Sequence, residues 1–181
     1  HIRHFILSPT EGGIYCLKRK SKKSNSVNPD LLDHCELILE KPSSGYVYFI
    51  KDYRPIRRHT DLGKHYNNFN YACKFANVIS KNLQHAESFH NIYQLCLKAF
   101  DAWEENKKPE VIYYKSLYLF TKEEGYPVKE QWLNQLNSEL RESAVTAIKT
   151  AVKDFEDPKD NLIELIENLS NWIPAHTDII I

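Results

Sequence analysis

The stretch YVYFIKDYRPIRRHTDLGKHY, residues 46–66, contains the change of pattern that decides the fold. Its first part, Tyr46–Tyr53, is rich in aromatic and β-branched residues, which favour a β-strand. After Thr60 the strand pattern ends, and apolar residues recur at three- and four-residue spacing, as they do in amphipathic helices. Residues 54–62 are therefore the expected boundary between a β-rich part and a helical part.

Three further strands are expected before this boundary. Arg3–Ser8 is an apolar run, and Gly13–Lys20 follows it after a turn at two glycines. His34–Lys41 alternates between two faces, and the sequence PSSG that follows at 42–45 is typical of a hairpin turn. Four strands with short connections predict a small Greek-key or barrel sheet.

The remaining two-thirds of the chain has the apolar spacing of a helical bundle. The expected helical segments are Leu62–Gln84, Ser88–Glu105, Pro109 to a stop at Gly125, Val128–Val152, and Pro158 to an end at Pro174. The fourth segment fits either one helix or two helices broken near Asn137 and Ser138. The sequence therefore predicts an α+β protein.

The net charge of zero hides a division along the chain. Residues 1–60 contain 11 Lys and Arg against 6 Asp and Glu, which is a net +5. Residues 61–181 contain 13 against 18, which is a net −5. A basic front and an acidic back suggest that the front has a polyanionic partner.

Cysteine usage and hydropathy indicate a cytoplasmic protein without membrane contact. Four cysteines lie far apart with no C-x-x-C pair, so we expect buried free thiols in a reducing compartment: Cys16, Cys35, Cys73 and Cys96. No stretch approaches the ~20 apolar residues of a membrane span, and no signal peptide is visible. The chain begins at His1 and has no methionine, which suggests that its natural start lies upstream.

The first candidate site is a basic run directly after the second strand. It contains five cations: Lys18, Arg19, Lys20, Lys22 and Lys23. Such a run can neutralise phosphates at the edge of a barrel, with release of counterions. It can equally be a charged loop that keeps an exposed strand end soluble.

A second basic cluster follows the fourth strand, and aromatic residues accompany both clusters. The cluster consists of Lys51, Arg54, Arg57 and Arg58. It either extends the same positive surface, or Arg57 and Arg58 dock on the acidic helical part. Tyr46 and Tyr48 share a strand face and are candidate platforms for stacked bases, whereas cross-strand packing is the expectation for Phe49 on the opposite face.

Catalytic chemistry finds little support in the sequence. His85 and His90 fall on different helical faces, and the histidines and cysteines lack the spacing of a metal-ligand set. Only five glycines are present, and none fits a phosphate-binding G-x-x-x-x-G-K loop. We therefore expect a protein that is not an enzyme and has no cofactor.

Several short motifs resemble the bacterial RecO family of recombination mediators. The family's strand of the type L-F-T-x-E-x-G-K, which precedes a basic segment, is matched at Phe5, Ile6, Leu7, Ser8, Glu11 and Gly12. Its L-x-x-L…G-Y-x-P turn is matched at Leu117, Phe120, Gly125, Tyr126 and Pro127. The sequence NWIPAHT at 171–177 looks like the family's last helix and tail.

The resemblance implies an amino-terminal OB-like β-barrel over residues 1–60, with four of its five strands visible, and an acidic helical bundle over 61–181. It implies a non-catalytic role in DNA repair: binding of single- and double-stranded DNA, annealing, and recombinase loading with RecR and single-stranded DNA-binding protein, in the bacterial cytoplasm at the nucleoid. Some family members carry a cysteine zinc site after the G-Y-x-P turn. VKEQWL stands at 128–133 here, which implies a zinc-free variant.

In the RecO family a groove of the helical part takes the acidic, hydrophobic tail of single-stranded DNA-binding protein. By analogy, one of three tryptophans could line such a groove, although a core position is the first expectation: Trp103, Trp132 and Trp172. The lysines that could face the tail are Lys98, Lys107 and Lys115. Two other function classes stay open, namely a protein-interaction scaffold and an RNA-binding barrel.

Overall fold

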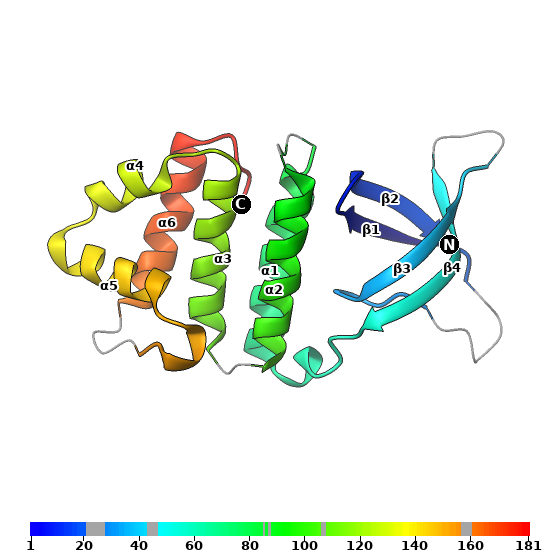
Figure 1. Cartoon of the computed structure of the whole chain (residues 1–181), viewed down its shortest axis with the longest axis horizontal. Helices are drawn as coiled ribbons and strands as arrows, with labels where there is room; N and C mark the ends of the chain where they lie inside the picture. The colour runs from blue at the N-terminus through cyan, green and yellow to red at the C-terminus, as the bar shows by residue number, and fades with distance from the viewer. Residues whose placement is uncertain (21–27, 43–46, 85, 87, 106–107, 157–160) are drawn as a thin grey trace.

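The computed structural model covers all 181 residues of the chain. The structure is described for residues 1–20, 28–42, 47–84, 86, 88–105, 108–156 and 161–181. A four-stranded sheet lies at one end of the elongated molecule, and the helices stack beside it in successive layers (Figure 1). The predicted α+β class is therefore confirmed.

The sheet is mixed and open. Its strands are β1 (Ile2–Ser8), β2 (Gly12–Lys18), β3 (His34–Glu40) and β4 (Tyr48–Arg57). They lie in the order β1-β2-β4-β3, with both outer pairs antiparallel and the central pair, β2 and β4, parallel. β1 and β3 form the two edges of the described sheet, so closure into the expected OB-like barrel is not shown.

β4 extends beyond Tyr53, where its end was expected, to Arg57, and so includes Pro55. Proline has no N–H to donate, and it is tolerated only where a strand side is unpaired. The pairing of β4 with β2 is confined to Tyr48 and Phe49, so the β2 side of the strand is unpaired at Pro55. Pro55 therefore fits inside the strand.

The two faces of the sheet differ in burial. The inner face carries a small apolar cluster of Cys16, Ile50 and Tyr53, with Ile6, Cys35, Leu37, Leu39 and Tyr48 packed against it. The outer face is exposed at Tyr15 and Ile38. In β3 the alternation is as predicted, with Leu37 and Leu39 half-buried and Glu36, Ile38 and Glu40 exposed.

The helices begin directly after the sheet. They are η1 (Leu62–Lys64), α1 (Tyr66–Asn82), α2 (Phe89–Glu105), α3 (Pro109–Glu123), α4 (Val128–Gln135), α5 (Ser138–Lys149), η2 (Val152–Asp154) and α6 (Leu162–His176). The segment Val128–Val152 contains two α-helices, and the side chain of Asn137 caps the second by accepting from the Leu140 N–H. The alternative with a break near Asn137 is therefore correct.

The last helix ends later than expected. α6 passes through Pro174 and ends at His176, and the Thr177 N–H still donates to the Ile173 carbonyl. A single proline in the last turn removes one hydrogen bond without stopping the helix. The helix begins at Leu162, four residues after the expected start at Pro158, which lies outside the described residues.

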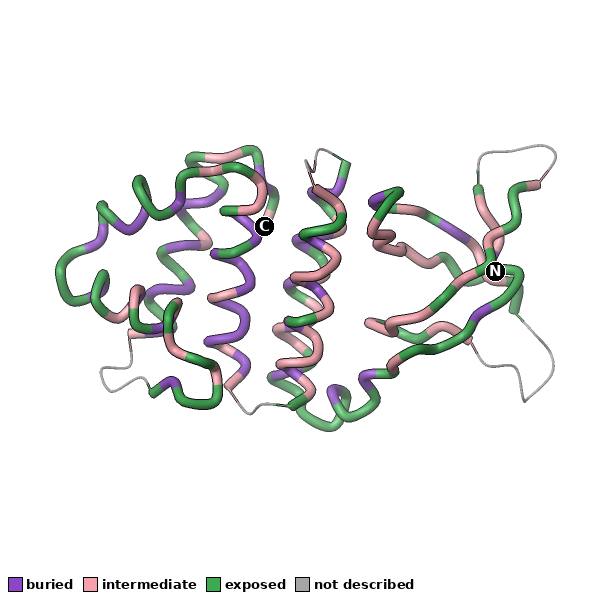
Figure 2. The backbone as a smooth tube through the Cα atoms, viewed as in Figure 1, coloured by how far each residue is buried: buried purple, intermediate pink, exposed green. Residues whose placement is uncertain are grey.

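The main core belongs to the helical part. Buried residues concentrate in α3 and its neighbours, whereas the sheet is mostly half-buried or exposed (Figure 2). All three tryptophans are buried in this core: Trp103, Trp132 and Trp172. The Trp103 indole donates to the Pro109 carbonyl and the Trp132 indole to Asn168, so both are structural groups in the described molecule.

The cysteines are free thiols, as predicted. Cys16 and Cys96 are buried, while Cys35 and Cys73 are half-buried. Burial raises the pKa of Cys16 to about 11 and that of Cys96 to about 12, so both thiols stay protonated and unreactive at neutral pH.

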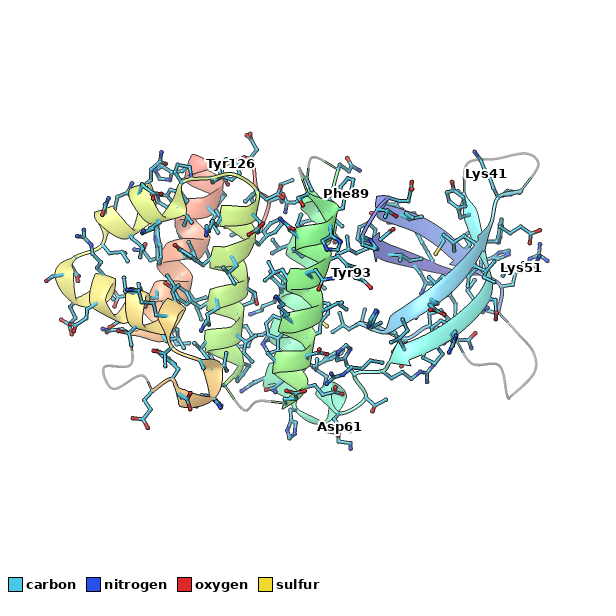
Figure 3. The ribbon with its side chains drawn as sticks, in the orientation of Figure 1. Lys41, Lys51, Asp61, Phe89, Tyr93 and Tyr126 are labelled. Carbon is cyan, nitrogen blue, oxygen red and sulfur yellow. The ribbon has the colours of Figure 1, made fainter. Side chains whose placement is uncertain are left out.

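The sheet docks on the layer formed by α1 and α2, which lies between it and α3 (Figure 1). Gly12 has φ of +71°, and a Cβ atom at this position would lie 2.7 Å from a ring carbon of Phe89. Farther along α2, the Tyr93 hydroxyl lies 2.9 Å from His34 Nε2 (Figure 3). One side of α2 therefore contacts both the β1–β2 turn and the start of β3.

Candidate nucleic-acid interface

The strand register collects cations at the end of the sheet farthest from the helices, which we call the distal end. Ile2 pairs with Lys18, and the N-terminus lies at this end (Figure 1). Phe49 pairs with both Leu17 and Glu40, so β4 begins and β3 ends here as well. The distal cations are Arg3, Lys18, Arg19, Lys20, Lys41 and Lys51, of which Figure 3 labels the last two.

No carboxylate of the described residues pairs with the distal cations. Among the residues that the structure describes, none of the six forms an ion pair. Arg3 and Arg19 contact aromatic rings instead, with Arg3 Cζ 4.2 Å from the ring centre of Tyr15 and Arg19 Cζ 5.6 Å from that of Phe49. The distal end therefore carries positive charge that the described protein does not neutralise.

Lys18 differs from its neighbours because it shares the inner face with Cys16 by strand alternation. His4 on β1 shares this face, and its Nε2 atom is buried with no partner among the described residues. Desolvation, and secondarily the charge of Lys18, lowers the pKa of His4. Lys18 therefore lies at the rim of the inner face, with Arg19 and Lys20 exposed beyond it.

The second basic cluster is divided between the two ends of the sheet. Lys51 is exposed at the distal end, and Arg54 makes an exposed ion pair of 3.4 Å with Glu36. Arg57 and Arg58, at the end of β4 nearest the helices, are occupied by acidic and polar groups of the protein. The four residues therefore do not form one continuous positive surface.

Arg57 docks the sheet on the helices, as one of the two alternatives proposed. Its guanidinium lies 3.0 Å from Asp101, 3.0 Å from Glu104 and 3.2 Å from Glu105, all on α2. These acceptors, first among them the hydrogen bond to Glu104, raise the pKa of Arg57. Three carboxylates of α2 thus surround its positive charge.

Arg58 makes its contacts within the sheet part and not with the helices. It donates to the Asn28 carbonyl at 2.9 Å and to the Tyr53 hydroxyl at 3.2 Å. The Tyr53 hydroxyl in turn donates to Asp33, a carboxylate whose side chain is almost fully buried. The docking alternative therefore describes Arg57 but not Arg58.

His59 completes the junction, and sequence reasoning missed it. Its Nδ1 lies 2.8 Å from the Leu32 carbonyl, and its Nε2 lies 3.0 Å from Asp101. A carbonyl and a carboxylate both accept, so the two contacts are hydrogen bonds at once only when each ring nitrogen carries a hydrogen. The position after two arginines gave no signal of this role, because Asp101 is 42 residues away.

Of the two aromatic residues predicted as platforms, the structure describes Tyr48, which lies on the inner face. Tyr48 lies beside Cys16 and packs on the inner-face cluster, whereas Phe49 lies beside Leu17 on the outer face with Arg19 near its ring. Alternation correctly places Tyr48 and Phe49 on opposite faces of the strand. Only the pairing register with β2 shows which of these faces lies on the apolar cluster. Tyr46 lies outside the described residues, as do Lys22 and Lys23.

A cavity of about 660 Å³ lies between the inner face of the sheet and helices α1 and α2. Both edge strands border it, through residues such as Ile6 and Leu37, and Cys73 and Leu97 close it from the helices. The lining is mainly apolar. The inner face of the sheet therefore faces a mainly apolar space.

Within the described ranges, no group of three or more His, Cys, Asp or Glu side chains is arranged to hold a metal ion. The helices in the described part of the chain are all too short or too polar to cross a membrane. Lys98 and Lys115 lie on helices of the bundle, and Lys107 lies outside the described residues. The Lys115 ammonium donates to the Thr150 carbonyl, and burial lowers its pKa.

Comparison of the chain with protein-family models gives no match, and comparison with curated proteins gives none.

Proposed function

We propose that this chain binds DNA through the distal end of its sheet and acts as a non-catalytic recombination mediator of the RecO type. The observation that carries the proposal is the contrast between six distal cations without carboxylate partners in the described structure and the neutralised arginines near the helices. A cation that has no partner in the protein can bind a phosphate without first losing an ion pair. The distal end is thus the part best suited to a polyanion.

The DNA-binding set consists of the distal cations, while Arg57 belongs to the sheet–helix junction and Arg58 contacts Tyr53 and Asp33 within the sheet part. Binding of Arg57 to a phosphate would require it to leave Asp101, Glu104 and Glu105. This separation supports a contact of limited size, with little sequence readout, because phosphate contacts carry no base information. Lys22 and Lys23 stay in the proposal on the strength of their sequence position alone.

We propose further that the sheet is the larger part of an OB-like barrel. Its mixed order, with a parallel pair between two antiparallel pairs, is compatible with a Greek-key connection. A fifth strand would have to lie between the edges β1 and β3, over the apolar cavity. OB-like barrels bind oligonucleotides on strand faces and loops, which agrees with the position of the cations.

The mediator role rests on the RecO-like motifs together with the division of charge. A basic sheet that gathers single- and double-stranded DNA can promote annealing by reducing repulsion between strands. The acidic helical part is then the surface for RecR and for the tail of single-stranded DNA-binding protein. No covalent chemistry belongs to this proposal.

The direct test is a fluorescence anisotropy titration of labelled single-stranded DNA with the whole chain at several salt concentrations. Four phosphate contacts give a slope of log affinity against log salt of about −3, at about −0.7 per contact on a single strand. The triple variant K18Q/R19Q/K20Q should reduce the slope to about −1. The matched control is K129Q/K149Q/K153Q, which removes the same charge from exposed positions of the helical part and should leave the slope unchanged.

The other function classes appear as outcomes of the same titration. Binding that is absent at every salt concentration would reject the proposal in favour of a helical interaction scaffold. Tighter binding of RNA than of DNA with the same sequence would assign the site to RNA, through contacts with the 2′-hydroxyl. An equal loss of slope in the control triple would show non-specific attraction and contradict the proposed site.

A further inference from the structure

The outer face of the sheet carries two partly accessible aromatic rings beside the distal cations. Tyr15 alternates with Cys16, which is fully buried, and is itself 46% exposed. Phe49 alternates in the same way with the buried Ile50. Both rings are therefore on the opposite side of the sheet from its apolar cluster. Packing in that cluster does not account for their position.

Tyr15 is held in place by neighbours on β1. The Phe5 ring lies opposite it across the strand pair, with ring centres 5.0 Å apart. Phe5 itself lies over Gly13, where a Cβ atom would come within 2.8 Å of the Phe5 ring. Arg3 also contacts the Tyr15 ring. The exposed ring is therefore already held in place, and a ligand that stacks on it pays little side-chain entropy for ordering it.

Phe49 has a similar environment on β4. Arg19 lies near its ring, and the His1 ring meets it at 5.5 Å and 66°, an edge contact. The two aromatic positions thus repeat one arrangement, an outward ring with an arginine over it. Arginine planes and aromatic rings both stack on nucleobases, and they do so most readily where bases are unpaired.

The spacing of the rings suits a strand of nucleotides. Leu17 lies beside Phe49, and Tyr15 is two residues before Leu17 on the same face, so the two positions are diagonal neighbours with Cα atoms about 8 Å apart. This is on the order of two base steps of about 3.4 Å each. A single strand could therefore place bases on both rings while its phosphates meet the distal cations.

We infer that Tyr15 and Phe49, each beside an arginine, form a two-position stacking platform for the unpaired bases of a single-stranded nucleic acid. This inference rests on the proposed function and adds its substrate class, single strands in preference to duplex. A duplex hides the faces of its bases within the stack, so it can use the cations but not the rings. A peptide partner would need acidic groups to match the six distal cations, and it is an outcome of the test below.

The test compares a labelled single-stranded oligonucleotide with one of the same length whose nucleotides lack bases. The two have the same phosphates, so a protein that binds only the backbone binds them equally. We expect the wild-type chain to bind the normal strand at least about tenfold more tightly than the abasic strand. At equal salt, it should also bind the normal strand at least about tenfold more tightly than duplex DNA. The slope of affinity against salt should be the same for both single strands.

Two variants locate the effect. Tyr15→Leu and Phe49→Leu should each weaken binding of the normal strand about tenfold and leave binding of the abasic strand unchanged. Tyr15→Phe should restore the wild-type affinity, because it keeps a ring, and this excludes loss of fold as the cause. Tyr66→Leu is the control, since Tyr66 is 77% exposed and begins α1, a helix that lies far from the sheet's distal end (Figure 1).

The outcomes separate this inference from the proposed function. Equal, salt-dependent binding of normal and abasic strands would overturn the platform and leave backbone binding intact. Lack of binding to either strand would overturn both. Displacement of the normal strand by an acidic aromatic peptide, with no effect of removing the bases, would assign the rings to a protein partner and also overturn the inference.

Discussion

The two ends of the sheet carry cations in opposite electrostatic situations. At the end near the helices, Arg57 faces three carboxylates of α2 and Arg58 contacts Tyr53 and the buried Asp33. At the distal end, none of the described cations has a carboxylate partner. The comparison teaches that positive charge in this chain has two uses, one in holding the sheet on the helices and one in facing solvent, and that only the second is available to a polyanion.

The largest predicted effect concerns the turn that seats the sheet on α2. Gly12→Val should lower the free energy of unfolding by about 2–4 kcal/mol, because the left-handed backbone and the Phe89 ring both exclude a side chain. Urea denaturation measures the change. Gly63→Ala is the matched control, since a Cβ atom at Gly63 meets nothing within 4 Å, and it should change stability by less than about 0.5 kcal/mol. Equal effects of the two variants would contradict the proposed seating of the turn.

The next effect concerns Asp101, which joins Arg57 and His59. Asp101→Ala removes the acceptor of both groups and should cost about 1–2 kcal/mol of stability, a value moderated by the partial exposure of the carboxylate. Chemical denaturation again gives the value. DNA affinity should stay within about twofold of wild type. A large loss of affinity with unchanged stability would mean that the two ends of the sheet are not separate in function.

A smaller effect, with a defined sign, concerns the pH dependence contributed by His4. Its pKa is lowered in the folded protein, first by desolvation and then by Lys18, so the unfolded chain binds the proton more readily. Stability from this group is therefore present above the unfolded value of 6.5 and is lost as the pH falls toward the folded value. Unfolding measured at pH 7 and pH 5 should show a larger loss for wild type than for His4→Phe. An equal loss in both proteins would show that His4 is not desolvated.

The smallest effect concerns the ion pair between Arg54 and Glu36. Both side chains are exposed, at 79% and 64%. The attraction between the two charges is therefore weak, because water around them has a high dielectric constant. Arg54→Gln should change stability by less than about 0.5 kcal/mol, as measured by thermal or urea unfolding. A loss larger than about 1 kcal/mol would show that the pairing of β3 with β4 depends on this ion pair.

Much of the fold follows from local pattern. The change near Thr60, the four strands and the break at Asn137 are all visible as changes of spacing or as capping residues. The end of β4 was missed because Pro55 is tolerated only through an unpaired strand side, which is a property of the sheet and not of the segment. The end of α6 was missed because a proline in a last turn interrupts little.

The candidate site was less predictable because it depends on register. Sequence identifies the cations, but it cannot tell that Arg57 meets Glu104, 47 residues away, while Arg19 lies near Phe49. Alternation pairs Tyr48 with one face and Phe49 with the other, yet the covered face is set by which residues of β2 lie alongside. The docking stripe of α2, with Phe89, Tyr93 and Asp101, could have been found as the helix face left over once the apolar stripe was assigned.

The most direct test of the central claim is the salt dependence of single-stranded DNA binding in two variants that remove positive charge from opposite ends of the sheet. K18Q/R19Q/K20Q should flatten the slope of log affinity against log salt by about 2 and leave the unfolding free energy nearly unchanged. R57Q should leave the slope unchanged and lower the unfolding free energy. If R57Q flattens the slope as much per charge as the distal triple does, the division of the sheet into a docking end and a binding end is wrong.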